Sequence, residues 1–219
     1  MLARISLGRV GNSLPTKELL AFQLAHARAR DAVFNELDCT SYVQYCALNV
    51  HSAAPNRTIY LRRPDLGRRL SDPFLLQRGD YDAVLILADG LSATAVHRHA
   101  GPVLDALLPL LEGWKLAPIV VAQQARVAIS DEIGELLGAK MSLILIGERP
   151  GLSSPDSLGA YLTWGPRVGR NDSERNCVSN IREEGLKPEL AARRIAMLME
   201  AARGQRITGV RLSGTAISE

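Results

Sequence analysis

The sequence contains few of the residues that define a disulfide-rich or membrane-spanning protein. Its 219 residues include three cysteines, too scattered for a disulfide framework or for the paired spacing of a zinc site. No apolar run approaches the roughly 20 residues that a membrane helix needs, and the N-terminus shows no signal-peptide pattern. We therefore expect a cytoplasmic protein with reduced thiols and no membrane contact.

Lysine is also scarce, and the formal net charge of +3 is small. The chain has neither a lysine-rich stripe nor an aromatic stacking motif, so we expect no nucleic-acid partner. Its basic residues are nearly all arginines, which suit planar contacts at interfaces and with phosphate. A GC-rich genome that favours arginine codons explains the same bias equally well. The lysines are Lys17, Lys115, Lys140 and Lys187.

The usual catalytic signatures are missing as well. There is no GxSxG elbow, Walker loop, HExxH pair or GxGxxG fingerprint. The four histidines do not form a metal-ligand set, and His97 and His99 are two residues apart, which places them off a shared helix face. The sequence thus indicates no catalytic centre and no metal site of its own.

The N-terminal third is expected to consist of a helix and a connector. Apolar residues recur at helical spacing from Lys17 to about Leu37. The polar stretch Asp38–Arg57 is predicted to be irregular. The segment Tyr60–Leu70 then places four arginines around a Pro-Asp-x-Gly turn signal. Such a run is usually a solvated face, and its turn chemistry makes it a candidate docking element.

From Asp82 onward, short apolar runs alternate with helical patterns. The runs 83–88, 118–122 and 141–146 predict strands buried on both faces of a sheet. Ser92 is placed to cap a helix with a break or bend at Gly101-Pro102. Further helices are expected before Gly138 and from Pro188. This alternation favours an α/β fold with a doubly wound, mostly parallel sheet.

Ligands of such sheets bind beyond the carboxyl ends of the strands. Three predicted loops lie there, at 89–91, 123–127 and 147–151, and the polar segment Arg175–Ile181 is a fourth candidate. Glu148 and Arg149 have an alternative interpretation as a simple ion pair. Cys177, taken alone, is more often a small buried residue than a reactive one. The loops make a ligand edge plausible and identify no ligand.

Six sequence blocks stand out in order along the chain: YLRRPDLGRRL (60–70), ADGLS (88–92), DEIGELLGA (131–139), GERPGL (147–152), SLGAY (157–161) and RNCVSNIR (175–182). Together they resemble the small subunit of ethanolamine ammonia-lyase, and the similarity extends from about Gly8 to Gly209. The arm element Gly8–Gly11 is similar to the family's Gly-Arg-Ala-Gly, but Asn12–Pro15 lacks the Pro-Arg-Pro-Arg character that usually follows.

This resemblance implies an adenosylcobalamin-dependent lyase that deaminates ethanolamine to acetaldehyde and ammonia. The chain would be a Rossmann-like subunit, inactive alone. A large TIM-barrel subunit would hold the substrate, with the cofactor between the two. The implied assembly is a hetero-dodecamer, located in a bacterial microcompartment. By position, residues 1–81 would form a helical arm and connector that dock on the large subunit, and 82–219 would form the cobalamin-binding domain.

Carried over by motif, the cofactor contacts fall on Val127, Glu148 and Cys177, and no catalytic or metal-binding residue is implied. Glu148 can accept hydrogen bonds from the primary amides of the corrin rim. The DxHxxG pattern, in which a protein histidine replaces the cofactor's own base, is absent, so base-on binding is expected. The alternative is a non-enzymatic cobalamin- or nucleotide-binding module, which would bind its ligand without a partner.

Overall fold

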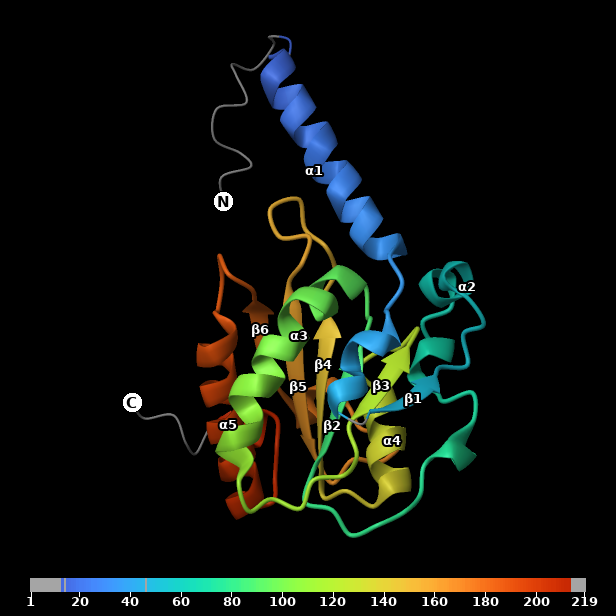
Figure 1. Cartoon of the computed structure of the whole chain (residues 1–219), viewed down its shortest axis with the longest axis vertical. Helices are drawn as coiled ribbons and strands as arrows, with labels where there is room; N and C mark the ends of the chain where they lie inside the picture. Colours follow the sequence, from blue (N-terminus) through green and yellow to red (C-terminus); the bar gives the residue numbers. More distant parts are fainter. Residues whose placement is uncertain (1–12, 14, 46, 214–219) are drawn as a thin grey trace.

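The computed structural model describes residues 13, 15–45 and 47–213. The described helices and strands alternate over most of this length, and short 3-10 turns connect several of them (Figure 1). The Gly8–Gly11 arm element lies outside the described residues. The helices are α1 (Thr16–Phe34), α2 (Arg57–Arg62), α3 (Ala93–Leu107), α4 (Ile129–Leu137), α5 (Pro188–Gln205) and α6 (Val210–Ser213). The strands are β1 (Leu48–His51), β2 (Val84–Ala88), β3 (Val120–Gln123), β4 (Met141–Gly147), β5 (Leu158–Trp164) and β6 (Arg175–Ile181).

The six strands form one mixed sheet in the order β1-β3-β2-β4-β5-β6. The first four strands in this order pair in parallel. Strands β5 and β6 pair antiparallel, first β5 with β4 and then β6 with β5. The α/β class predicted from the sequence is confirmed, and the sheet has a parallel half and an antiparallel half.

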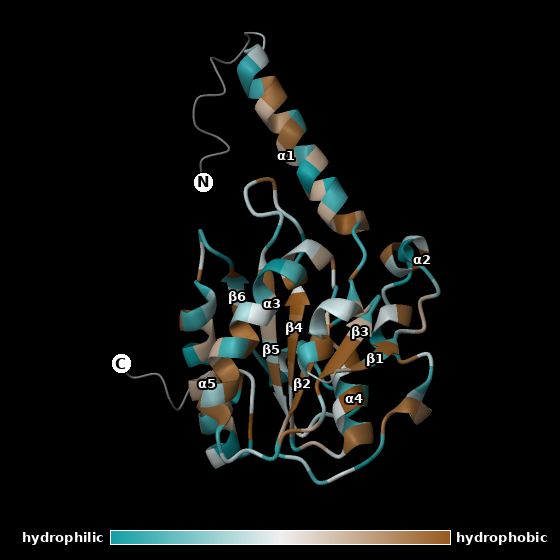
Figure 2. Cartoon of the chain, in the orientation of Figure 1, coloured by the Kyte–Doolittle hydropathy of each residue, from teal (hydrophilic) through white to brown (hydrophobic). Residues whose placement is uncertain are grey.

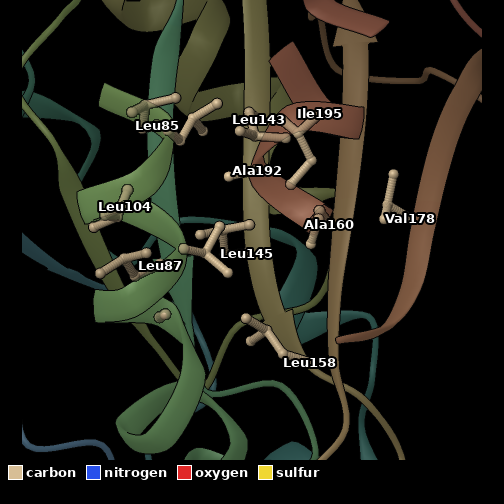
Figure 3. Close-up of a cluster of buried hydrophobic side chains, with 14 of the residues drawn as sticks. Leu85, Leu87, Leu104, Leu143, Leu145, Leu158, Ala160, Val178, Ala192 and Ile195 are labelled. Carbon is tan, nitrogen blue, oxygen red and sulfur yellow. The ribbon is translucent and has the colours of Figure 1, made fainter. Parts of the chain in front are cut away.

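The three strands predicted from apolar runs are confirmed as β2, β3 and β4. Every residue of β2 and β4 is buried, because both faces of the parallel half are covered. Odd-numbered residues such as Leu85 and Leu143 pack with α3 and α5 in one cluster (Figure 3). Even-numbered residues such as Ile86 and Ile144 pack with α4 in a second cluster. Alternation along each strand therefore supplies two cores, one on each face.

Two capping predictions are confirmed, and of the break or bend expected at Gly101-Pro102, the break is absent. The Ser92 hydroxyl accepts a hydrogen bond from the Ala95 N–H at 3.2 Å and begins α3. Gly138, with φ of 71°, ends α4 in the left-handed conformation that glycine adopts most easily. Pro102 does not end α3, which continues to Leu107.

The prediction that Asp38–Arg57 is irregular was wrong. This stretch contains a 3-10 helix, Cys39–Tyr45, and the edge strand β1. Strand β1 pairs with β3, and its burial is partial. Four residues with mixed exposure give no clear apolar run or alternation, which is why the sequence pattern did not reveal the strand.

The helix expected from Lys17 is confirmed as α1, and it extends away from the rest of the chain (Figure 1). Only Ala32, near its end, is buried. Large apolar side chains along it are exposed, including Leu20 at 58% and Phe22 at 52%. In Figure 2 the ribbon of α1 alternates between brown, hydrophobic segments and teal, hydrophilic ones along its length. None of the helices in the described part of the chain has the length and apolar character needed to cross a membrane.

Candidate functional site

The loops that follow β2 and β4 lie against each other at the carboxyl edge of the parallel half. Leu91 donates its backbone N–H to the Gly147 carbonyl at 2.9 Å. Gly90 has φ of +55°, and a Cβ there would lie 2.2 Å from the Gly147 carbonyl oxygen. A side chain at Gly90 would therefore separate the two loops. After β2 the chain continues into α3 on one face of the sheet. After β3 it continues into α4 on the other face.

Part of the antiparallel half is covered on one face only. Val178 is buried in the cluster beneath α3 and α5, whereas Cys177 and Ser179, its neighbours in β6, are exposed. In β5, Leu162 is buried on the same side as Val178, and Tyr161 on the opposite side is half-buried. Because side chains alternate along a strand, this pattern defines an open sheet face beside α4. We call this face, with Glu148, Gly159, Tyr161 and Cys177, the open face.

Glu148 follows β4 directly and is half-buried at the rim of the open face. Its Oε2 atom accepts hydrogen bonds from the Ser157 hydroxyl at 2.5 Å and from the Asn180 backbone N–H at 3.2 Å. Among the described residues, none donates to Oε1. A Cβ at Gly159 would lie 2.9 Å from Oε1, so the absence of a side chain at Gly159 makes room for the carboxylate. One carboxylate oxygen is thus fixed and the other is available to a ligand.

Cys177 lies on the open face in the middle of β6, directly across from Tyr161 of β5. The prediction that Arg175–Ile181 is a loop was wrong, as was the interpretation of Cys177 as a buried residue, because the residue is exposed. Desolvation by the surrounding sheet raises the pKa of the Cys177 thiol, a hydrogen bond from Tyr161 lowers it, and the negative charge of Glu148 raises it further. The net shift is upward, so the sulfur is a neutral thiol at pH 7.

Val127 lies in the loop between β3 and α4 and is half-buried. Its side chain packs against the cluster beneath α4, as does the Tyr161 ring. Its carbonyl accepts hydrogen bonds from the Ser130 N–H at 3.1 Å and the Ser130 hydroxyl at 2.8 Å. No residue in the described ranges accepts the backbone N–H of Val127, which leaves that donor available to a ligand.

The three residues predicted from the sequence therefore have different positions. Val127 and Glu148 lie beyond the carboxyl ends of β3 and β4, as expected for a ligand edge. Cys177 lies four residues before the end of β6 rather than in a loop. Tyr161, which interacts with both Glu148 and Cys177, was not selected from the sequence. The alternation through Gly159, Ala160, Tyr161 and Leu162 was the signal that could have placed it on a half-open strand.

A buried polar cluster holds the β3–α4 loop in place. Asp89, 1% exposed, accepts the backbone N–H groups of Gln124 and Ala125, each at 2.9 Å. Arg57 donates to Asp89 at 3.1 Å and, through Nε, to the Val33 carbonyl near the end of α1 at 2.6 Å. A buried charge pair with these extra hydrogen bonds fixes geometry more than it adds stability. The cluster ties the base of α1 to the loop that carries Val127.

Tyr60 packs beside this cluster and belongs to the arginine-rich segment singled out in the sequence. Its hydroxyl is 2.8 Å from the carbonyl oxygens of both Gly90 and Ala125. The guanidinium groups of Arg57 and Arg126 lie over its ring, at 4.7 Å and 4.3 Å from the centroid. The segment thus contributes a buried anchor, while the arginines that surround the turn, Arg62, Arg63, Arg68 and Arg69, are exposed.

Within the described residues, no group of three or more His, Cys, Asp or Glu side chains is arranged to hold a metal ion. The fold and the open face together define the class: an α/β protein with a mixed sheet, part of whose polar edge is left uncovered by its own helices. Comparison with known proteins identifies the family. The sequence model described as Ethanolamine ammonia-lyase light chain (EutC) matches residues 1–213, and the chain belongs to this family of lyase subunits.

Individual relatives agree with this assignment. The chain is 53% identical over 231 residues to the ethanolamine ammonia-lyase small subunit of Pseudomonas aeruginosa strain LESB58, covering 98% of this chain and 84% of the relative. It is 53% identical to the protein of that name from Pseudomonas syringae pv. tomato, covering 98% of this chain and 80% of the relative. The corresponding Azotobacter vinelandii protein is 52% identical, over 98% of this chain and 85% of the relative.

Proposed function

We propose that this chain is the small subunit of an ethanolamine ammonia-lyase and that, with a large subunit, it binds adenosylcobalamin for the deamination of ethanolamine to acetaldehyde and ammonia. Family membership over residues 1–213 is the observation that carries this proposal. The chain is a subunit of the catalyst and is expected to be inactive alone, because no self-contained catalytic motif is present in its sequence.

The open face fits the periphery of a corrin ring. That periphery carries primary amides, each of which offers two N–H donors and one carbonyl acceptor. Glu148 has an available Oε1 acceptor, and the backbone N–H of Val127 is an available donor. The exposed Cys177 supplies a small, neutral surface on the same open face. The residues expected to hold the cofactor therefore match it in hydrogen-bonding character.

When bound, the cofactor would supply the radical chemistry, and the protein would supply orientation and shielding from water. Glu148 would hold an amide at the rim, with its carboxylate kept in place by Ser157 and Asn180. Val127 would hold a second group through its backbone. The absence of the DxHxxG pattern from the sequence supports base-on binding, in which no histidine of this chain replaces the cofactor's own base.

We propose that residues 1–81 dock on the large subunit, chiefly through α1. A helix of 19 residues with one buried residue gains little from the rest of this chain, and isolated helices of this length are marginally stable in water. Its exposed Leu20, Phe22 and Leu24 need a partner surface. The resemblance of the sequence to its family supports a TIM-barrel partner in a hetero-dodecamer located in a bacterial microcompartment.

We also infer that residues 82–219 form a Rossmann-like, doubly wound cobalamin domain. The parallel order β3-β2-β4, with α3 and α4 on opposite faces, supports this classification. In such sheets ligands bind beyond the carboxyl ends of the strands, at the point where the strand order reverses. Strand β1, from the earlier segment, extends this sheet by one edge strand.

Co-expression with the large subunit tests the proposal. The chain would be purified alone and with its co-expressed partner, and each preparation titrated with adenosylcobalamin by visible absorbance, with ethanolamine turnover as a second measurement. We expect turnover and retained cofactor only in the complex. Tight binding by the lone chain, with no turnover in the mixture, would instead establish a cobalamin-binding module and refute the lyase assignment.

A further inference from the structure

Tyr161 occupies the middle of the open face, between the residues expected to hold the cofactor. It is paired across the sheet with Cys177. Its ring and the Glu148 side chain both lie next to Gly159, because a Cβ there would be 3.1 Å from the Tyr161 ring and 2.9 Å from Glu148 Oε1. The ring also packs against the same cluster as Val127. Tyr161 therefore adjoins Cys177 and Glu148, two of the three residues of the expected site.

The hydroxyl of Tyr161 differs in its hydrogen bonding from those of the buried tyrosines. Tyr42 and Tyr60 donate to backbone carbonyls at 3.0 Å and 2.8 Å. Among the described residues, no oxygen acceptor is bonded to the Tyr161 hydroxyl. Its cross-strand neighbour is the thiol of Cys177, and sulfur is a weak acceptor. A half-buried phenol without a strong partner can take an acceptor or donor of a ligand at little cost.

The charge state of Tyr161 suits a hydrogen bond to a ligand. Burial raises the pKa of the phenol, and the neighbouring Cys177 and Glu148 raise it further. The group thus remains a neutral phenol at any physiological pH, with one proton to donate and lone pairs to accept. A ligand amide can use both, since it carries a carbonyl oxygen and an NH₂ group.

We propose that Tyr161 is a further cofactor contact, whose hydroxyl hydrogen-bonds a primary amide of the corrin periphery while its ring supports the macrocycle edge. This inference rests on the proposed function and adds a residue to its site. Occupancy of the site thus gives the phenol a hydrogen-bond partner stronger than any that the described residues offer it.

The test is Tyr161→Phe in the co-expressed complex, with Tyr81→Phe as the matched control. Tyr81 is also half-buried and packs against the same cluster, but it lies at the opposite edge of the sheet, where it bridges to Ala139. Loss of one neutral hydrogen bond predicts adenosylcobalamin affinity about 3- to 10-fold weaker in Tyr161→Phe. We expect the cofactor-free unfolding temperature of this variant and the affinity of Tyr81→Phe to remain unchanged. Turnover at saturating cofactor should also recover in Tyr161→Phe.

Two other outcomes separate this inference from the proposed function. If Tyr161→Phe binds adenosylcobalamin as tightly as the unaltered complex while Glu148→Gln binds it weakly, Tyr161 is not a contact and the proposed function stands. If the unaltered complex fails to bind adenosylcobalamin at all, the proposed function fails and the role of Tyr161 fails with it. Equal losses of affinity in Tyr161→Phe and Tyr81→Phe would indicate a general packing effect and would also overturn the inference.

Discussion

The parallel and antiparallel halves of the sheet are built from the same kind of strand and are covered differently. In β2 and β4 of the parallel half, every residue is buried between helices on both faces. In β6 of the antiparallel half, Arg175, Asn176, Val178 and Ile181 are buried, while Cys177, Ser179 and Asn180 are exposed. Hydropathy follows the same division, from brown strands at the centre to a paler, teal β6 (Figure 2).

This difference separates stability from binding within one sheet. Side chains of the parallel half are committed to packing, because each contacts a core on its own face of the sheet. Side chains on the open face are only partly covered, so polar groups such as Glu148 Oε1 remain available to a ligand. We therefore expect substitutions in the parallel half to lower stability, and substitutions on the open face to change affinity.

The largest effect is expected where the two halves are joined, at the buried ion pair of Arg175 in β6 and Asp131 in α4. The two side chains are each 2% exposed, and their closest contact is 2.6 Å. Arg175→Met leaves Asp131 buried without its partner, which should lower the free energy of unfolding by about 3–5 kcal/mol. Urea denaturation of the purified chain followed by circular dichroism would measure this loss.

The matched control replaces both partners of this pair. Asp131→Leu combined with Arg175→Met removes both charges and fills the space with apolar groups, so most of the lost stability should return. If Arg175→Met alone were as stable as the unaltered chain, the junction between α4 and β6 would not depend on this pair.

A smaller loss is expected from a cavity in the parallel half. Leu143 of β4 is 1% exposed and packs beneath α3 and α5 (Figure 3). Leu143→Ala should lower the free energy of unfolding by about 3 kcal/mol, while cofactor affinity in the complex stays within twofold of the unaltered value. If fully folded Leu143→Ala showed a large change in cofactor affinity, the two halves would not be functionally separate.

The reverse pattern is expected on the open face. Glu148→Gln keeps the shape of the side chain and removes its charge, so the unfolding temperature should change little. Loss of a charged acceptor should weaken adenosylcobalamin binding in the complex by about 10- to 100-fold, the equivalent of about 1.5–3 kcal/mol. Visible-absorbance titration measures this change. Unaltered affinity would remove Glu148 from the cofactor site.

The smallest effect is expected in acid, at Asp156 in the loop between β4 and β5. Burial raises the pKa of Asp156, but hydrogen bonds from Arg98 at 2.8 Å and His99 at 3.4 Å outweigh it, so the net shift is downward. A lowered pKa stabilises the fold above the unfolded-state value, about 3.9, and this stabilisation is lost as the pH falls through the folded-state pKa.

Urea denaturation at pH 5 and at pH 3 would test this dependence on Asp156. Asp156→Asn should lose less stability over this interval than the unaltered chain, by about 1 kcal/mol or less, because Arg98 is largely exposed. Identical pH profiles for the two proteins would assign the acid sensitivity to other carboxylates.

The same contrast between the halves explains what sequence reasoning could predict. Strands β2, β3 and β4 were found because burial on both faces requires continuous apolar runs. Strand β6 was taken for a loop because its open face carries Cys177, Ser179 and Asn180 among the buried residues. The Asp131–Arg175 pair joins residues 44 positions apart, and no local pattern encodes such a contact.

The candidate site was predictable to a similar extent. Glu148 and Val127 follow apolar runs, so their place at the sheet edge follows from the rule for parallel strands. Cys177 was selected only through the family resemblance, and its position in mid-strand depends on the register between β5 and β6. The position of Tyr161 opposite Cys177 arises from that same register and could not be read from spacing along the chain.

The Arg57 guanidinium has a consequence for how the arm and the ligand edge respond to each other. It bonds the Val33 carbonyl at the base of α1 and the Asp89 carboxylate that holds the β3–α4 loop. One guanidinium thus joins the last turn of α1 to the carboxylate that fixes the loop before Val127. If a partner bound to α1 changed the affinity of this loop for a ligand, the ligand would change the affinity for that partner by the same factor, because coupling between two binding sites is reciprocal.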